Sequence, residues 1–521
     1  DANDSIATAL ADLLLEQDDE QWSILEPIDL QSEGGATLTR LADGSILASG
    51  RNILGDVYSI VAHVPSAVAV VRLEAMTDES LPNGGPGRDP QYDTGNFNMT
   101  HWEIAAQRSE AAEIKLPIHK VVVEPSENSQ ISVRTWNVSA HKSQPNTATY
   151  LLEQPMASPQ GFKLQFRMQF SNDQNWPLQN LGRFRISISA DPDAFLRTQA
   201  RIEALQTRDP WKRLAAAYAI AGETAALEEI LQARPTVASA AGDLQRMMGR
   251  FEEAIGSYNS VITPNSLDAR LVANRAAAHA GLEHWDLAKT DWLHAAELQS
   301  GFLKDEFLRY QENEQWKIAS QIGLLLMERQ YAERPSLGHN ETLLWIQVGT
   351  VLVLAEDAKA YSDFCTRLFN EYKDEQQHFS VQRLCHACLL TPQGFDPEKL
   401  PYEKLVEFQE AGSAYEPWFE PWLYSIRALT TYRRGNPQTT LELALKSREY
   451  EGLVELGHAL DLALIAMAQQ QLHNHDAALA ALDELSHVVE RQRFDRENNQ
   501  DLLTARILLR EAEAMILDAQ E

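Results

Sequence analysis

The sequence predicts a two-part protein, with an N-terminal antiparallel β-sandwich followed by an α-solenoid built from helical hairpins. Two changes in periodicity support this prediction. Between Trp22 and Ser189, short runs alternate apolar and polar residues with a period of two, and Gly and Pro punctuate them. From Ala194 onward the apolar residues recur at helical spacing, and part of that region repeats every 34 residues. A chain of 521 residues is also too long for one ordinary core, so at least two domains are expected.

Charge and composition narrow the classes of partner. The chain carries 45 Lys and Arg residues against 75 Asp and Glu residues, which gives a formal net charge of −30. Such a balance argues against nucleic acid as a partner, because binding to its backbone needs clustered basic residues. With only three cysteines there is no disulfide framework. We find no signal-peptide pattern and no apolar run of the ~18 residues that a membrane span needs.

Three segments are expected along the chain. Ile6–Leu15 has the pattern of an apolar-faced helix with no partner before it. We therefore interpret residues 1–17 as the last helix of a preceding helical repeat, and the sequence as a piece of a longer protein. Residues 18–193 are assigned to the sandwich and residues 194–521 to the solenoid. Pro192 marks the change, because proline ends the last strand pattern.

A series of short strands is expected in the sandwich. Asp43-Gly44, between the second and the third, is a strong signal for a tight hairpin. Many short strands with no helical pattern between them indicate an antiparallel sandwich of jelly-roll type. The expected strands are Trp22–Leu25, Ala36–Leu41, Ser45–Ala48, Val57–Val64, Val68–Met76, Thr100–Ala105, Val121–Val123, Ser132–Trp136, Ala148–Leu152, Lys163–Phe170 and Arg183–Ser189.

The clearest repeat in the helical part runs from Pro235 to Phe302 as two hairpins in one register. A small residue recurs at the eighth and twentieth positions of each, and an aromatic residue at the twenty-fourth. Small residues let two helices pack closely, and the aromatic residue fills the gap to the next hairpin. This is the tetratricopeptide pattern. The positions are Gly242, Ala254 and Tyr258 in the first hairpin, and Ala276, Ala288 and Trp292 in the second.

The remaining helices are less regular. Trp211–Ala221 and Thr224–Ala233 predict a degenerate hairpin before the two clear repeats. Residues 303–421 are expected to be helical, with loops at Arg334–Asn340 and Thr391–Pro401. Small residues twelve positions apart then return, as in the clear repeats. The final helix, about Gln500–Leu517, has one apolar face and a polar remainder, which predicts a capping helix.

Several segments of the sandwich resemble one family of domains. They read GGATLTRLADGSILASG (34–50), VAVVRLEAM (68–76), SLPNGGPGR (80–88), GNF (95–97) and LGRFRIS (181–187). They resemble a galactose-binding-like jelly-roll domain, as in discoidin and other carbohydrate-binding modules, that occurs in multidomain proteins of planctomycete bacteria. Two later segments resemble the helical tail of members associated with serine/threonine kinases; they read RLCHACLLTPQGFD (383–396) and WLYSIRALTTYRRGN (422–436). The resemblance implies a sandwich that could bind a glycan, although residues 89–94 and 98–101 depart from the family pattern.

The glycine-rich loop is the first candidate ligand site. Glycines leave backbone N–H and C=O groups bare, and Arg88 offers a planar fork of five donors that suits carboxylates or paired hydroxyls. Asp89 and Asp93 could supply carboxylates to a structural calcium ion. The alternative is that the loop only crosses the end of the sandwich, with Arg88 paired to Asp89 or Asp93. The predicted ligand-binding residues are Asn83, Gly84, Gly85, Gly87, Arg88 and, as a second contact, Trp176.

Other candidates have a structural interpretation beside the functional one. Trp102 and Trp136 could stack on a sugar, although Trp102 shares a sheet face with apolar neighbours and is expected in the core. The CHAC motif at 385–388 lacks the further ligands of a zinc site and the His of a haem motif, so buried helix cysteines are expected. In the solenoid, Arg270 and Asn274 come nearest to a carboxylate clamp, and we assign them to the partner groove.

The sequence shows no catalytic motif. Kinase, P-loop, nucleophile-elbow and zinc-protease signatures are all missing. The chain is therefore expected to be a non-catalytic binding or scaffold protein, with no cofactor beyond a structural calcium ion. Its solenoid groove would hold a protein partner, and its sandwich a glycan or a peptide. Two alternatives stay open: a regulatory region of a larger enzyme, such as a serine/threonine kinase, and a purely structural module.

Overall fold

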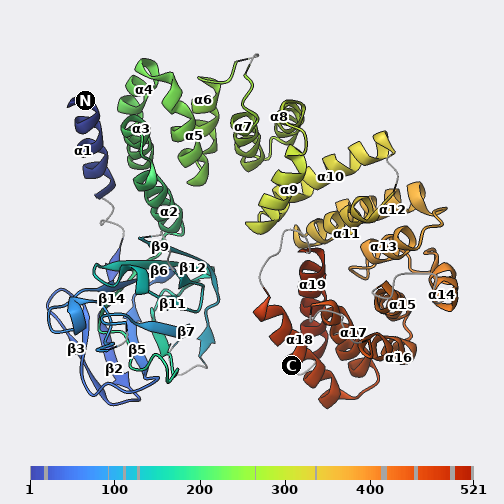
Figure 1. Cartoon of the computed structure of the whole chain (residues 1–521), viewed down its shortest axis with the longest axis horizontal. Coiled ribbons are helices and arrows are strands. Elements are labelled where there is room, and N and C mark those ends of the chain that lie inside the picture. The colour runs from blue at the N-terminus through green and yellow to red at the C-terminus, as the bar shows by residue number, and fades with distance from the viewer. Residues whose placement is uncertain are drawn as a thin grey trace. The chain divides into compact units, whose positions relative to one another are not determined.

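The computed structural model describes residues 2–16, 22–91, 93–108, 113–125, 130–263, 266–334, 337–411, 419–450, 456–492 and 499–517 (Figure 1). The chain forms two compact units, Asp1–Ser266 and Leu267–Glu521, and each is described by itself. The first unit holds strands β1 to β14 and helices α1 to α6, and the second holds helices α7 to α19. The predicted fold class is confirmed: an antiparallel β-sandwich precedes a helical-repeat region. The boundary expected between residues 17 and 18 lies outside the described residues.

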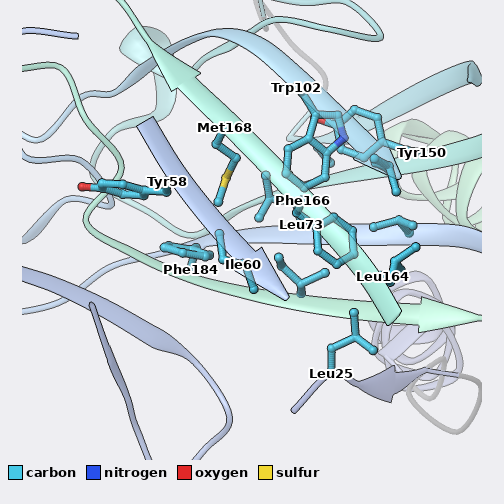
Figure 2. Close-up of a cluster of buried hydrophobic side chains, with 14 of the residues drawn as sticks. Leu25, Tyr58, Ile60, Leu73, Trp102, Tyr150, Leu164, Phe166, Met168 and Phe184 are labelled. Atoms are coloured by element: carbon cyan, nitrogen blue, oxygen red, sulfur yellow. The ribbon is translucent and has the colours of Figure 1, made fainter. Parts of the chain in front are cut away.

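The sandwich consists of two antiparallel sheets, each with seven described strands. Their facing sides share one apolar core, in which the rings of Trp102 and Phe166 stack with centroids 5.5 Å apart (Figure 2). Trp102 and Trp136 are both buried there, so their structural interpretation is confirmed. The first sheet has the order β3 (Ala36–Arg40), β4 (Ile46–Gly50), β14 (Arg183–Ser189), β6 (Ala67–Met76), β12 (Asn146–Ala157) and β9 (Ile118–Glu124), with β1 (Ser23–Ile24) beside β14. The second has the order β10 (Gln130–Ile131), β11 (Trp136–Asn137), β7 (Asn98–Gln107), β13 (Phe162–Phe170), β5 (Val57–Val64) and β2 (Pro27–Ser32), with β8 (Ile114–Lys115) beside β7.

Most strands lie where the two-residue alternation predicts them. β5 and β14 have the expected bounds, and β3 and β4 form the hairpin expected at Asp43-Gly44. The single strand expected over Ser132–Trp136 is wrong, because β10 and β11 are separate strands that pair with each other. The Ser132 hydroxyl accepts the backbone N–H groups of Arg134 and Thr135, and this closes a turn between them.

The helices of the first unit pack on the sandwich and on each other. α2 (Asp193–Gln206) follows the last strand and lays Phe195 against Val70 of β6. α1 (Ala2–Glu16) packs on α3 (Pro210–Ala221), and the Trp211 indole donates to Asp4 at 2.9 Å across 207 positions of sequence. The first helix therefore has a helical neighbour within this chain. The other helices are α4 (Thr224–Ala233), α5 (Ala238–Met247) and α6 (Phe251–Asn259).

The second unit is a run of helical hairpins. The predicted close-packing positions Ala276 and Ala288 are fully buried, as is the aromatic Trp292. In the earlier hairpin, α5–α6 of the first unit, a Cβ on Gly242 would lie 2.7 Å from the ring of Tyr258, so the small residue makes room for the aromatic one. The helices are α7 (Ala269–Gly281), α8 (Trp285–Leu298), α9 (Phe302–Glu312), α10 (Trp316–Glu333), α11 (His339–Leu354), α12 (Ala358–Tyr372), α13 (His378–Cys388), α14 (Tyr402–Ala411), α15 (Glu420–Arg433), α16 (Pro437–Arg448), α17 (Gly457–Gln471), α18 (His475–Arg491) and α19 (Asn499–Ile516). Among the described helices, none combines the length and the hydropathy that crossing a membrane would require.

Candidate functional site

The glycine-rich loop between β6 and β7 packs tightly against its own continuation. A Cβ on Gly87 would lie 1.9 Å from a backbone carbonyl oxygen of the facing segment, and one on Gly85 would lie 2.6 Å from the Gly95 carbonyl oxygen. The Gly87 N–H also donates to the Gly95 carbonyl at 2.8 Å. Asn83 and Gly84 turn the chain with φ values of 55° and 64°. Gly85 and Gly87 are therefore needed where two backbone segments touch, whether or not a ligand binds.

Arg88 is buried within this region, with 6% of its surface exposed. Its guanidinium donates to the Gly50 carbonyl at 2.9 Å and lies 3.4 Å from the Tyr58 hydroxyl. The backbone carbonyl of Arg88 accepts the side-chain amide of Asn52 at 2.9 Å. Arg88 thus bonds to a carbonyl and a hydroxyl of the sandwich, and among the contacts of the described residues none joins its guanidinium to Asp89 or Asp93. Its donors point into the protein, where they connect three segments of chain.

Asp89 and Asp93 are held by donors of the protein itself. Asp89 is fully buried and accepts the backbone N–H groups of Gln91 and Asp93, each at 2.9 Å, and the Gln179 side chain at 3.2 Å. Asp93 pairs with the Lys142 ammonium group. In the described part of the chain, no group of three or more His, Cys, Asp or Glu side chains is placed to hold a metal ion. These contacts occupy the carboxylate oxygens that a calcium ion would need.

Trp176 lies in the loop between β13 and β14, and half of its surface is exposed. This loop adjoins the glycine-rich loop. The Asn52 side-chain amide donates to the carbonyls of both Arg88 and Leu178, and the Arg88 N–H donates to the Asn180 carbonyl at 2.8 Å. The structure therefore brings together the two regions predicted to share a ligand. Of the two, the Trp176 loop offers the exposed aromatic surface, while the charged groups of the other loop face inward.

Arg270 and Asn274 lie one turn apart on α7. Arg270 pairs with Glu306 of α9, and Arg309 also donates to that carboxylate, with its Nε at 3.0 Å. Glu306 is fully buried, and Asn274 is 8% exposed. A ligand carboxylate could therefore bind Arg270 only in competition with the buried carboxylate of Glu306.

The cysteines are buried helix residues, as expected. Cys365, Cys385 and Cys388 are free thiols in the interior of the second unit. Burial raises the pKa of the Cys385 thiol to about 12, so it stays protonated and is a poor nucleophile. Burial also lowers the pKa of His386 to about 3, so this imidazole is neutral and lies 3.2 Å from the Thr504 hydroxyl of α19.

The last helix is buried on more sides than the predicted cap would be. α19 packs against α17 and α18, as a cap does, but it also packs against α11, far earlier in the chain (Figure 1). Its leucines Leu503 and Leu508 are fully buried, and so is its polar residue Asn499. The Asn499 side-chain N–H donates to the Gln311 side-chain oxygen of α9 at 2.9 Å, and the Asn499 side-chain oxygen accepts from Gln347 of α11 at 3.3 Å. Part of the polar remainder of this helix thus faces protein, because earlier hairpins supply partners for Asn499.

Later hairpins hold the rest of α19. Arg433 of α15 pairs with Glu511 at 2.7 Å, and the same guanidinium donates to the carbonyls of Leu389 and Leu390 at 3.0 Å each. With His386 of α13 and the packing of α17, the first helices of five successive hairpins contact α19. We call their α19-facing sides, on α9, α11, α13, α15 and α17, the inner surface. Repeat arrays normally contact only their neighbours, whereas contacts across 152 and 188 positions resemble those of a bound peptide.

A separate depression lies along the turns of three successive hairpins in the second unit. It has a volume of about 520 Å³, and the half-buried rings of Trp285 and Trp316 line it. One glutamate from each turn lines it as well: Glu283, Glu314 and Glu356. We call this depression the turn pocket.

Each of these glutamates has a backbone conformation that favours glycine. Their φ values are 58°, 55° and 58°. This left-handed conformation costs an L-residue with a Cβ roughly 1–2 kcal/mol. Three other hairpins carry glycine with positive φ at the corresponding turn, namely Gly222, Gly249 and Gly435, while the α17–α18 turn carries His473 with a φ of 63°. The sequence analysis did not single out the turn pocket. The signal that could have found it is a glutamate at the turn position where three other hairpins have glycine.

Comparison with known proteins does not assign this chain to a family. No protein-family model matches this chain, and a search of the curated proteins found no match. The resemblance to galactose-binding-like domains and to tetratricopeptide proteins therefore stays a prediction. The residues of the chain itself carry what can be proposed about its function.

Proposed function

We propose that this chain is a non-catalytic protein-binding scaffold whose inner surface takes an amphipathic helix of a protein partner. The observation that carries the proposal is the packing of α19, a whole helix that contacts the first helices of five hairpins. Helices that dock in a groove are recognised by apolar anchors three and four positions apart. Hairpins of the tetratricopeptide kind, which the sequence predicts here, stack into arrays with extended binding surfaces. In this chain α19 would be the intramolecular occupant of such a surface.

The chemistry of the inner surface suits selective helix binding. Full burial of a leucine such as Leu503 or Leu508 contributes about 1.5–3 kcal/mol, so a few anchors supply affinity. The buried contacts of Asn499 and the partly buried pair of Glu511 with Arg433 contribute less net stability, but leaving a buried member such as Arg433 unpaired is costly. A helix with apolar anchors alone would leave the Arg433 guanidinium without its carboxylate partner and the Gln311 side-chain oxygen without its donor. The inner surface therefore favours a helix that carries an amide near its N-terminus and a carboxylate near its C-terminus.

The sandwich supports a second proposal, a glycan or peptide ligand at its loop end. Trp176 is the specific observation in its favour, because half of its surface is exposed and an aromatic face matches the apolar face of a sugar. Trp176→Ala in the intact chain should abolish binding to an immobilised glycan array without lowering the melting temperature. Equal binding by the variant would refute this proposal.

The helix-binding proposal is tested by supplying α19 in trans. A chain ending at residue 492 is mixed with a fluorescein-labelled peptide of residues 499–517, and binding is followed by fluorescence anisotropy. We expect saturable binding with a Kd of about 10⁻⁶ M, since several leucines are buried against a preformed surface. The intact chain should bind the same peptide at least ~100-fold more weakly, because its own α19 competes at high effective concentration.

Two peptide variants give the matched control. Leu503→Asp places a charge at a fully buried position and should abolish binding, whereas Arg510→Gln changes an exposed position and should leave the Kd unchanged. Circular dichroism of the shortened chain shows whether the hairpins fold without α19. If that chain loses its helical signal, α19 is an ordinary core helix and the proposal fails. It also fails if the chain stays helical and does not bind the peptide.

A further inference from the structure

The turn pocket combines two kinds of surface that together recognise organic cations. The rings of Trp285 and Trp316 offer π-faces, which attract a guanidinium or ammonium group placed over them. The lining also holds three glutamates against one lysine, Lys317, so the pocket carries negative charge. The carboxylates are exposed and the rings are half-buried. A cation could therefore lie on the aromatic wall while it reaches the acidic rim.

The chain itself shows which cations these carboxylates accept. Glu314 receives the guanidinium of Arg506 at 3.0 Å, and Glu283 lies 3.9 Å from the Lys317 ammonium group. Glu356 has no ion-pair partner among the described residues. It is the carboxylate of the pocket that is open to an incoming ligand.

Placement of the glutamates adds weight to a binding role. They occupy three consecutive hairpin turns, α7–α8, α9–α10 and α11–α12, and all three line the same pocket. Each sits in a left-handed conformation that glycine adopts without strain. Stability alone would favour glycine at these turns, so the side chains are kept at a conformational disadvantage. Strain of this kind tends to gather at functional positions.

We propose that the turn pocket is a docking site for an arginine-bearing basic segment of a protein partner. Arginine fits better than lysine, because its planar guanidinium can stack on a tryptophan and present two parallel N–H groups to a carboxylate. The chain has a net charge of −30, which draws a basic segment toward it and repels acidic ones. This site is distinct from the inner surface, and its test leaves α19 in place.

The test uses the intact chain and a fluorescein-labelled peptide of alternating glycine and arginine. The reference is the same peptide with citrulline in place of arginine, which keeps the shape and removes the charge. We expect the arginine peptide to bind saturably and the citrulline peptide to bind about tenfold more weakly or worse. Because an acidic chain attracts any basic peptide, the measurement is made at 0.15 M salt, where charges more than about 8 Å apart are largely screened.

Matched variants separate the pocket from the general charge of the chain. Glu356→Gln and Trp316→Leu should each weaken binding of the arginine peptide about tenfold. Glu297→Gln removes the same charge from an exposed position on α8 outside the lining, and it should leave the Kd within a factor of two. Circular dichroism of each variant checks that the hairpins remain folded.

Three results would overturn the proposal. The first is equal binding of the arginine and citrulline peptides, and the second is equal weakening by Glu297→Gln and Glu356→Gln, which would show a diffuse charge effect. The third is competition by free tetramethylammonium at concentrations close to the Kd of the peptide, which would assign the pocket to a small organic cation. None of these results bears on whether the inner surface binds a helix in trans.

Discussion

Replacing Arg88 with alanine is expected to destabilise the sandwich and to leave the second unit unaffected. Arg88 is 6% exposed and joins the glycine-rich loop to Gly50 and Tyr58 through its guanidinium. The variant removes this cross-link and opens space beneath the loop. If the loop were a ligand site with a solvent-facing Arg88, the same change would cost binding and little stability.

The size of the effect follows from the contacts of this guanidinium. A hydrogen bond from a charged donor contributes about 1.5–3 kcal/mol, and the 2.9 Å bond to Gly50 has good geometry. The 3.4 Å contact to Tyr58 is at the outer limit and adds little. Loss of the buried stem adds to the cost, while relief from burying a charge offsets part of it. We therefore expect a net loss of about 2–3 kcal/mol in the free energy of unfolding of the sandwich.

Hydrogen exchange followed by mass spectrometry measures this loss separately for each part of the intact chain. Amides of β5 and β13 lie in the core of the sandwich and are expected to exchange through its global opening. A loss of 2–3 kcal/mol should speed their exchange by about 30- to 150-fold. Amides of α7 and α8, in the other unit, should exchange at the rate of the parent and serve as the internal reference. Unchanged exchange in β5 and β13 would refute the structural role of Arg88.

Three further changes test the helical region. Ala288→Leu adds volume at a fully buried contact between helices and should lower the stability of the second unit by about 1–3 kcal/mol, measured by exchange of α7 and α8. Glu356→Gly relieves a positive φ and should raise that stability by up to about 1 kcal/mol in urea unfolding, even though it weakens the turn pocket. Burial raises the pKa of the Asp461 carboxyl to about 7. The stability that this carboxyl contributes is therefore full below pH 4 and is lost as the pH rises through 7. Asp461→Asn should remove this part of the pH dependence of stability. Urea midpoints at pH 5 and pH 8 should therefore differ more in the parent than in this variant.

Periodicity in the sequence predicted the parts of the fold that are set locally. The alternation of apolar residues predicted the bounds of β5 and β14, because the apolar side chains of both strands face the core of the sandwich, although Ser187 and Ser189 of β14 are buried as well. The strands it missed lie at an edge or are very short: β2 is the last strand of its sheet and is largely exposed, and β8 has two residues. The small residues of the hairpins, such as Ala288, were predicted correctly, since close helix packing excludes larger side chains there.

Long-range contacts explain what the sequence could not predict. The sequence of the glycine-rich loop, considered alone, suggests a ligand site. In the structure, however, Arg88 bonds to Gly50 and Tyr58, which lie 38 and 30 positions away. The polar residues of α19 suggested an exposed side, yet Asn499 meets Gln311 across 188 positions. Hydropathy patterns contain no information about which distant residue will satisfy a polar group. Such partners are visible only once the chain is folded.

Arg506 links the two sites proposed in the helical region. It belongs to α19 and donates to Glu314, which lines the turn pocket, at 3.0 Å. A cationic ligand that takes Glu314 must compete with Arg506, and by linkage the competition acts equally in both directions. The pair is about one-third exposed on both sides, so it contributes no more than about 1 kcal/mol and the coupling is at most about fivefold. Displacement of α19 from the inner surface frees Glu314 for a cationic ligand. A partner that carries both a helix and a basic segment therefore binds each site more tightly once it has occupied the other.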